Sequence, residues 1–272
     1  ATKDDVFKWH SNIGSHLVKE VEVEIGGQRI DKHYGEWLHI WNELTQEAGK
    51  AAAYSRMIGN VQKLVNPHYK GGVVPSYTCY VPLQFWFCRN PGLALPLIAL
   101  QYHEVKVNLQ FRAKEECYYG HGSEANKSLS LDSASLYVDY IYLDTDERRR
   151  FAQVSHEYLI EQLQHTGAES VAESNKSVKL KLNFNHPVKE LVWAVRPQNH
   201  TSENGQYDTS NVANDVTGTV FGKQFYNFSD HIDYTCVNGS PNNPMGNALL
   251  SETVGYVVGD ISGVSSTAPT AV

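Results

Sequence analysis

Histidine is the first residue type to consider for chemistry, because the 272-residue chain contains 12 of them and histidine both titrates near neutral pH and binds metals. His156 and Glu157 begin the sequence HEYLI, whereas a zinc-protease helix requires HExxH; the fifth position here is Ile160. His103 and Glu104 fall in a predicted strand, in which neighbouring side chains point to opposite faces. Neither pair can hold one ion, so we predict no metal site and no cofactor.

A charged run at residues 144–150, DTDERRR, raises two further possibilities. Its acidic side chains could bind calcium, but the glycine and the distant glutamate of a calcium loop are missing. Capping of a short helix by Asp144 or Thr145 fits the run better. Its three arginines form the only basic run of the sequence, and the net charge is −7. Because nucleic-acid binding requires a basic face that neutralises phosphates, we predict no nucleic-acid partner.

Motifs of common enzymes are missing from the sequence, which contains no GxSxG elbow, no P-loop and no readable pair of catalytic carboxylates. Gly26 and Gly27 lack the further glycines and the lysine of a phosphate loop, and they predict a tight hairpin turn instead. A catalytic triad is assembled in space, so missing motifs argue only weakly against an enzyme. We expect a protein that is not an enzyme and has no catalytic residues.

Five N-x-S/T sequons make asparagines candidates for glycosylation, which requires passage through a secretory compartment. The candidate sites are Asn126, Asn175, Asn199, Asn227 and Asn238. The cysteines show neither a CxxC pair nor zinc-type spacing, which favours buried free thiols over a disulfide framework. These thiols are Cys79, Cys88, Cys117 and Cys236. The N-terminal residues are polar, show no signal peptide and begin without methionine, so we expect a fragment or a processed piece.

The most apolar stretch, residues 84–107, reads QFWFCRNPGLALPLIALQYHEVKV. A membrane helix needs about 20 uninterrupted apolar residues, and prolines and a glycine interrupt this run. Pro91 and Gly92, after an asparagine, predict a turn. The alternation that follows predicts a strand with one buried face. We therefore predict two strands, one ending near Cys88 and one running to about Phe111, and no membrane span.

Periodicity predicts several elements before this stretch and after it. Residues 18–25, VKEVEVEI, alternate valine or isoleucine with glutamate, as an amphipathic strand does. Helical spacing of apolar residues predicts helices at about 34–44 and 49–58. Glycine, asparagine, serine and proline predict loops at 62–77 and 113–130.

A second group of strands is predicted beyond the loops. Residues 135–144, SLYVDYIYLD, alternate well enough to be a strand, and a charged, helix-prone connector follows. The later strand series is EYLIEQLQ (157–164), SVKLKLNFNH (177–186) and ELVWAVRP (190–197). Many short strands, few helices and long polar loops predict an all-β sandwich or barrel.

Four segments, in order, resemble the major capsid protein of nucleocytoplasmic large DNA viruses, with the nearest similarity to algal-virus and mimivirus-type members. The segments are VEVEIGGQRIDKHYGEW (21–37), VPLQFWFCRNPGLALPLIALQYHEVKV (81–107), YVDYIYLDTDERRRFAQVSHEYLIEQLQ (137–164) and LNFNHPVKELVWAVR (182–196). The resemblance covers about residues 17–197. Four long matches in the right order are far more specific than a short motif.

The resemblance implies two consecutive eight-stranded jelly rolls with short helices in loops: the first at 1–146, a connector at 147–157 and the second at 158–272. Both are expected to be incomplete, with opening strands upstream of residue 1 and later strands divergent or beyond residue 272. The resemblance supplies no catalytic, cofactor or metal site. The residues expected to act structurally, in turns, are Gly26, Gly27, Pro91 and Gly92.

The resemblance also implies a structural function. Three copies would form a pseudo-hexagonal capsomer, and capsomers would tile an icosahedral shell. The implied partners are the chain itself, neighbouring capsomers and minor capsid proteins, with an inner membrane nearby that the chain does not span. The protein would reside in the virion, assembled in the host cytoplasm.

Two other function classes remain open. A carbohydrate-binding β-sandwich would stack sugars on loop aromatics such as Tyr207, Phe225 and Tyr226, and a glycan-binding screen would test it. A sandwich-fold glycosidase would need a pair of carboxylates that the sequence does not identify.

Overall fold

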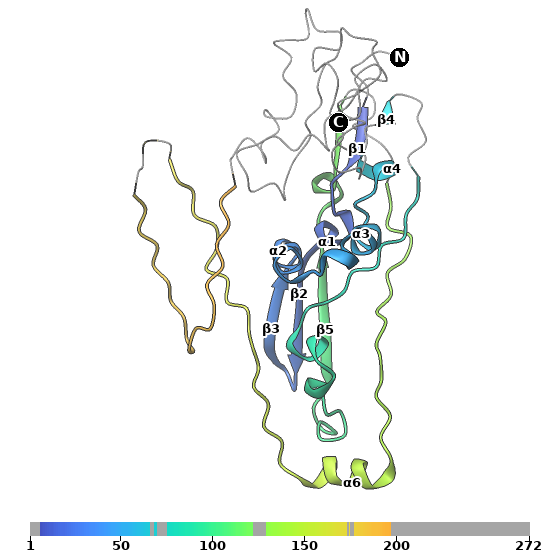
Figure 1. The fold of residues 1–272 in the computed structure, drawn as a ribbon, viewed down its shortest axis with the longest axis vertical. Coiled ribbons are helices and arrows are strands. Elements are labelled where there is room, and N and C mark those ends of the chain that lie inside the picture. The colour runs from blue at the N-terminus through green and yellow to red at the C-terminus, as the bar shows by residue number, and fades with distance from the viewer. Residues whose placement is uncertain are drawn as a thin grey trace, which may run out of the picture.

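A computed structural model describes most of the first 196 residues (Figure 1). The described ranges are 6–65, 68–69, 75–121, 129–172, 174 and 177–196. Several sequence predictions lie outside them: all five sequons, Cys236 and the loop aromatics Tyr207, Phe225 and Tyr226.

A three-stranded antiparallel sheet forms the centre of the described chain (Figure 1). Strand β2, Val18–Ile25, lies between β3, Gln28–Tyr34, and β5, Val105–Phe111. The strand predicted at 18–25 is therefore confirmed. Its valines face inward, and Val21 and Val23 are fully buried, as the alternation of side chains in a strand requires.

The turn between β2 and β3 contains the two adjacent glycines. Gly26 has φ of 60° and Gly27 has φ of 82°, a left-handed conformation that glycine adopts without strain. Ile25 pairs directly with Gln28, so the loop has two residues. Such a loop matches the twist of the flanking strands and sets the first pairs of the ladder, and a bulge between Val23 and Glu24 then shifts the register by one residue, so that Val23 pairs with Asp31.

The core beneath this sheet comes from two distant places in the sequence. Strand β2 contributes its valines, and the short helix α5, Trp86–Arg89, contributes Trp86 together with the preceding Phe85. Phe85 is fully buried. Its ring stacks on His33 of β3 at 4.5 Å between centroids and on Phe87 at 5.7 Å.

A second, smaller antiparallel sheet has the order β4-β1-β6. Strand β1, Val6–Trp9, pairs with β4, His68–Tyr69, and with β6, Tyr118–His121. Phe7 is fully buried, and its ring stacks on Tyr118 at 5.2 Å. The sequence analysis missed this sheet, because two to four residues are too few for an alternation to be recognised.

Helices lie between the two sheets (Figure 1). Helices α2, Gly35–Thr45, and α3, Ala48–Met57, confirm the two helices predicted from apolar spacing. The short helices α1, Ile13–Leu17, and α4, Gln62–Val65, complete this layer. Leu38 of α2 is fully buried.

Residues 84–107 contain only one of the two predicted strands. The strand running to Phe111 is confirmed as β5, but the strand ending near Cys88 is wrong, because α5 lies there. The 3₁₀ helix η1, Pro91–Leu93, occupies the predicted turn, and the Gly92 N–H donates to Asn90 Oδ1 over 2.9 Å. The aromatic run reads like a strand, yet one helical turn buries Phe85 and Trp86 together. No helix among the described residues is long and apolar enough to cross a bilayer.

The face of β5 that we predicted to be buried is only partly so. Val105 and Val107 are half-buried, and Val107 packs against the core, whereas Leu109 and Phe111 are exposed. The reason is position: β5 is an edge strand of the described sheet, and its C-terminal half runs beyond the core residues of α5.

The two predicted loops contain short elements. Residues 62–77 include α4 and β4, and residues 113–130 include the 3₁₀ helix η2, Lys114–Glu116, and β6. Leu64 and Cys117 from these segments are buried together with Ile13. Polar, glycine-rich flanks concealed these apolar anchors from the sequence analysis.

Free thiols occur at Cys79, Cys88 and Cys117 among the described residues. Burial raises the pKa of Cys79 and Cys117 to about 11, so their reactive thiolate form is rare at neutral pH. Cys88 is exposed, contrary to the expectation of a buried thiol. Two residues along a helix correspond to about 200°, so Cys88 points away from the core into which Trp86 points.

Beyond β6, the described chain is extended on both sides of one helix (Figure 1). This helix, α6, spans Thr145–Gln153. Its N-cap is Asp144, whose Oδ1 accepts a hydrogen bond from the Glu147 N–H over 2.8 Å. The helix cap predicted from the sequence is thus confirmed, and α6 occupies much of the predicted connector.

The strands predicted at 135–144, 157–164, 177–186 and 190–197 are not paired strands in the described residues. They are extended, but no ladder of hydrogen bonds joins them to a neighbour, and large side chains such as Tyr142 and Trp193 are exposed. An extended segment becomes a strand only when a partner takes up its backbone N–H and C=O groups. Alternation gave the extended conformation and could not supply the partner.

Candidate functional site

The described chain folds back on itself where residues 155–165 pass the outer edge of β3. The side-chain amide of Gln162 donates to the carbonyl of Ile30, and the Leu163 N–H donates to Asp31 Oδ1 over 3.2 Å. We call the contacts between residues 151–196 and the earlier part of the chain the junction. It is the best-defined site that the structure offers for joining parts of the molecule.

Asp31 is the buried anchor of the junction on β3. It faces inward because it pairs across the ladder with Val23, and His33 likewise pairs with Val21; directly opposed residues share one face of a sheet. Asp31 Oδ2 lies 3.0 Å from His33 Nε2, and both side chains are buried. Asp31 Oδ1 also accepts the Lys32 N–H over 2.8 Å. A buried carboxylate needs such partners to offset its lost hydration.

Arg89, the last residue of α5, forms the second contact of the junction. Its guanidinium lies 4.0 Å from the centroid of the Trp41 ring, a cation–π arrangement. Its Nε donates to the carbonyl of Gln84 over 3.0 Å, and its Nη1 donates to Glu161 Oε2 over 3.1 Å. The Trp41 ring and the Gln84 carbonyl therefore hold the Arg89 side chain in the position in which it binds Glu161.

Glu161 receives two cations from different parts of the chain. One carboxylate oxygen binds Arg89, and the other accepts a hydrogen bond from Lys189 Nζ. The pKa of Glu161 is lowered, chiefly by the Lys189 hydrogen bond and further by the positive charges of Lys189 and Arg89, against an opposing effect of burial. The carboxylate is thus charged at neutral pH and bridges both cations.

Further contacts lie at both ends of the junction. Arg196 Nη1 binds Glu36 Oε1 of α2 at 3.1 Å. The His165 ring packs on Tyr34 at 5.1 Å between centroids. Together with the contacts of Glu161 and Leu163, these spread the junction over β3, α2 and α5.

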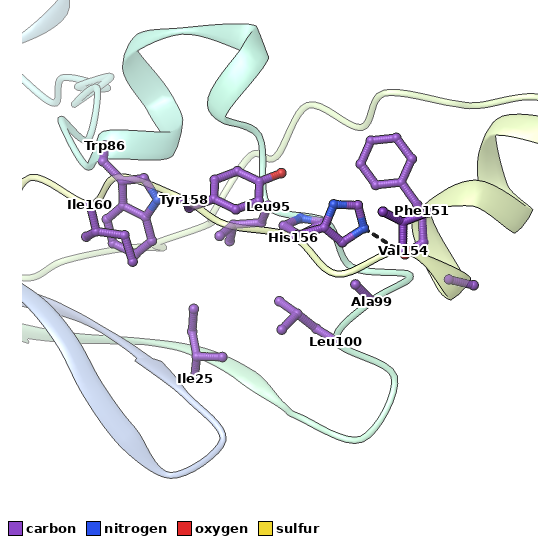
Figure 2. Close-up of a pocket in the computed structure, with 12 residues that line it drawn as sticks. Ile25, Trp86, Leu95, Ala99, Leu100, Phe151, Val154, His156, Tyr158 and Ile160 are labelled. Atoms are coloured by element: carbon purple, nitrogen blue, oxygen red, sulfur yellow. Dashed lines mark hydrogen bonds between the residues drawn. The ribbon is translucent and has the colours of Figure 1, made fainter.

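A cavity of about 400 Å³ lies at the end of the junction near α6 (Figure 2). Its lining is mostly apolar, with walls from both parts of the chain, including Ile25, Trp86, Leu95, Leu100, Phe151 and Ile160. Besides Trp86, two lining side chains carry hydrogen-bonding groups, and both bond main-chain carbonyls. His156 donates to Phe151 over 2.8 Å, and the Tyr158 hydroxyl donates to Ala94 over 3.2 Å. These polar groups serve to hold the walls together.

The chemistry of the junction is that of packing and ion pairing. The described residues include no group of three or more His, Cys, Asp or Glu side chains that could hold a metal ion. What the arrangement can do is fix one chain segment against another, through a buried carboxylate, a stacked arginine and a bridging glutamate.

The turn residues singled out from the sequence lie next to the elements that carry the junction. Gly26 and Gly27 precede β3, which carries Asp31, and Pro91 and Gly92 follow α5, which ends at Arg89. The segment 84–107, in which we predicted two strands, supplies cavity residues such as Leu95 and Leu100.

The charged residues of the junction were not predicted from the sequence: Asp31, Glu36, Arg89, Glu161, Lys189 and Arg196. Single charges in strands or loops carry no motif. The turn does not reveal Asp31 either, because the two-residue loop alone would set it opposite Glu22, and a register shift between Val23 and Glu24 brings it opposite Val23. Arg89 and Glu161, which bind each other, are 72 residues apart in the sequence. Their contact follows only from the fold.

Comparison with known proteins places the chain in a family. Residues 1–144 match the family described as "Major capsid protein N-terminus", and residues 147–251 match "Large eukaryotic DNA virus major capsid protein". The chain is 60% identical over 205 residues to the major capsid protein of Pyramimonas orientalis virus, covering 75% of this chain and 47% of that protein. It is 53% identical to capsid protein 1 of Acanthamoeba polyphaga mimivirus, covering 71% of this chain and 34% of that protein.

A solved structure agrees with the sequence matches. The quasi-atomic structure of the capsid of virus PBCV-1 superposes with a TM-score of 0.51 and 39% identity, covering 68% of this chain and 46% of that one. The chain spans about half the length, or less, of these relatives. The two consecutive family matches cover most of the 272 residues, and the chain belongs to the major capsid protein family of large eukaryotic DNA viruses.

Proposed function

We propose that the protein is a structural major capsid protein, which self-associates into trimeric, pseudo-hexagonal capsomers of an icosahedral shell. The observation that carries this proposal is the pair of consecutive capsid-family matches, at 1–144 and 147–251. The structural likeness to the PBCV-1 capsid supports it independently. On this proposal the protein acts through its surfaces and is not an enzyme.

The proposed architecture is two jelly rolls, at 1–146 and 158–272, joined by a connector at 147–157. The antiparallel sheet β3-β2-β5 and the β4-β1-β6 sheet are compatible with parts of the first jelly roll. Edge protection is the physical advantage of this architecture in a shell, because paired sheets limit uncontrolled strand pairing between subunits. Residues Gly26, Gly27, Pro91 and Gly92 would act in it as turns.

The proposed partners are further copies of the chain, neighbouring capsomers and minor capsid proteins, with an inner membrane close by. The location is the virion, after assembly in the host cytoplasm. Glycosylation of the five sequons stays a prediction, which the intact mass of protein purified from virions would test.

Sedimentation and electron microscopy of the full-length protein test the proposal. The expected result is a trimer with a hexagonal outline and a central depression. A protein that stays monomeric throughout the micromolar concentration range would contradict it.

A further inference from the structure

We propose that Glu161 is a positioning residue, which fixes where residues 155–196 lie against the first part of the chain. The inference concerns the internal geometry of one subunit and goes beyond the proposed capsid function. It rests on the convergence of three separate segments on a single carboxylate.

The two oxygens of Glu161 have different partners. Oε2 lies 3.1 Å from Arg89 Nη1, 72 residues earlier in the sequence, and Oε1 accepts from Lys189 Nζ, 28 residues later. A carboxylate can accept hydrogen bonds at both oxygens simultaneously. One side chain therefore connects α5, the segment 155–165 and the segment around Lys189.

The two cations differ in how firmly the fold holds them. The Arg89 side chain is 22% exposed, and it is oriented by the Trp41 ring and by the Gln84 carbonyl. An arginine held in this way loses little further freedom when it binds a carboxylate. The Lys189 side chain is 75% exposed, and exposed ion pairs contribute little to stability. Arg89 is thus the better-anchored partner of Glu161, and Lys189 is the more exposed one.

Neighbouring residues do not make the same connection. The side chain of Gln162 and the N–H of Leu163 donate hydrogen bonds to β3, to Ile30 and Asp31. Among the described residues, only Glu161 joins the 155–165 segment by side-chain contacts to both α5 and Lys189. The charged groups that act on it are Lys189 and Arg89.

Backbone amide exchange of the full-length protein with the substitution Glu161→Gln tests the proposal. The Leu163 N–H, which bonds Asp31, reports how firmly the segment is held. We expect its exchange to rise roughly threefold to tenfold, as the loss of a partly exposed charged hydrogen bond implies. Amides of β2 should exchange as in the unsubstituted protein. The matched control is Glu157→Gln in the same segment, where the residue is exposed to solvent.

Two further readouts separate positioning from a general structural role. In a double-mutant cycle, the effects of Arg89→Gln and Glu161→Gln on Leu163 exchange should be less than additive, because the two substitutions share the Arg89–Glu161 contact. The pH dependence supplies the second readout. The pKa of Glu161 is lowered on folding. Its contribution to the stability of the contact is therefore complete at a pH above the unfolded pKa near 4.5, and it is lost as the pH falls through the folded pKa. The difference in Leu163 amide exchange between Glu161→Gln and the unsubstituted protein should therefore disappear at a pH below the folded pKa of Glu161.

Two outcomes would overturn the proposal. One is a Leu163 exchange rate in Glu161→Gln equal to that in Glu157→Gln. The other is an equal rise in β2, which would indicate general destabilisation. Both are independent of oligomeric state, so a failure here is distinct from a failure to form trimers.

Discussion

Two segments of this protein have nearly the same pattern and very different surroundings. Residues 18–25, VKEVEVEI, and residues 177–184, SVKLKLNF, both alternate apolar with charged or polar side chains. The first is β2, paired on both edges, with Val21 and Val23 fully buried. In the second, Val178, Leu180 and Leu182 are 44%, 56% and 47% exposed. Alternation determines which side chains share a face, and the neighbours determine whether that face is buried.

The partners of β2 show how a neighbour is acquired. Strand β3 follows β2 after two glycines, so pairing the two strands costs little loop-closure entropy. Strand β5 begins some eighty residues later. Loop-closure entropy grows only slowly with length, so a distant partner is affordable when it buries apolar surface. The Val23–Val107 pair provides such burial, since Val23 is fully buried and Val107 packs against the core. Residues 177–186 contact another segment through a hydrogen bond from the Asn185 N–H to Gln164 Oε1.

The largest expected effect tests the buried member of the comparison. Phe85→Ala should destabilise the protein by about 3–5 kcal/mol, because it empties a fully buried aromatic site between β3 and α5. Urea or guanidinium denaturation followed by circular dichroism measures the loss. Tyr142→Ala is the aromatic control, since its ring is exposed, and should shift stability by less than about 0.5 kcal/mol.

The second prediction concerns the close approach of α1, β2 and α2. A Cβ added at Gly35 would lie 2.3 Å from the Val18 carbonyl oxygen and 2.5 Å from that of Ser15. Gly35→Ala should therefore cost about 1–3 kcal/mol through forced backbone shifts. Gly49→Ala in α3, with no atom within 4 Å, should be neutral or stabilising by up to about 1 kcal/mol. Equal effects in thermal melts would contradict this packing.

The third prediction makes the same substitution in both segments. Val21→Ala should cost about 2 kcal/mol, because two methyl groups leave a filled core. Val178→Ala should change stability by less than about 0.5 kcal/mol, because the side chain is half-exposed. Denaturation of both variants of the full-length protein measures the difference. A similar loss of stability in the two variants would contradict the difference between the segments, because it would show that residues 177–184 are buried in solution.

The smallest prediction asks whether local structure in the second region forms without a sheet. Asp144→Ala should cost about 1 kcal/mol of α6 stability, because it removes the acceptor of the Glu147 N–H. Faster amide exchange in α6, with β2 unchanged, is the expected readout. Asp146→Ala, which removes only a surface pair with Arg149, should have a smaller effect.

Several elements were predictable because their causes are local. The valines of β2, the glycine turn, the apolar spacing of α2 and the Asp144 cap each act within a few residues. The resemblance that names the family is also carried by the residues themselves, and the comparisons confirm it. The capping aspartate shows the limit of this kind of inference, since it predicts where α6 begins and nothing about what α6 contacts.

Other features could not be predicted from the sequence, because their causes lie far away along the chain. Phe85 and Trp86 look like a strand in sequence, and a helical turn forms there because β2 and His33 provide a core on one side only. Cys88 is exposed for the same reason. The small β4-β1-β6 sheet joins strands too short to be recognised alone.

By itself, then, the sequence determined the family, the extended and helical segments, and the turns between them, because periodicity, glycine and capping chemistry act over short distances. Only the tertiary structure decided which extended segments pair, that Asp31 is buried and bonded to the Leu163 amide, and that Arg89 and Lys189 meet at Glu161. The physical reason is that burial and ion pairing depend on separations in space. Arg89 and Glu161 are 72 residues apart in the sequence, so the distance between them is determined only by the fold.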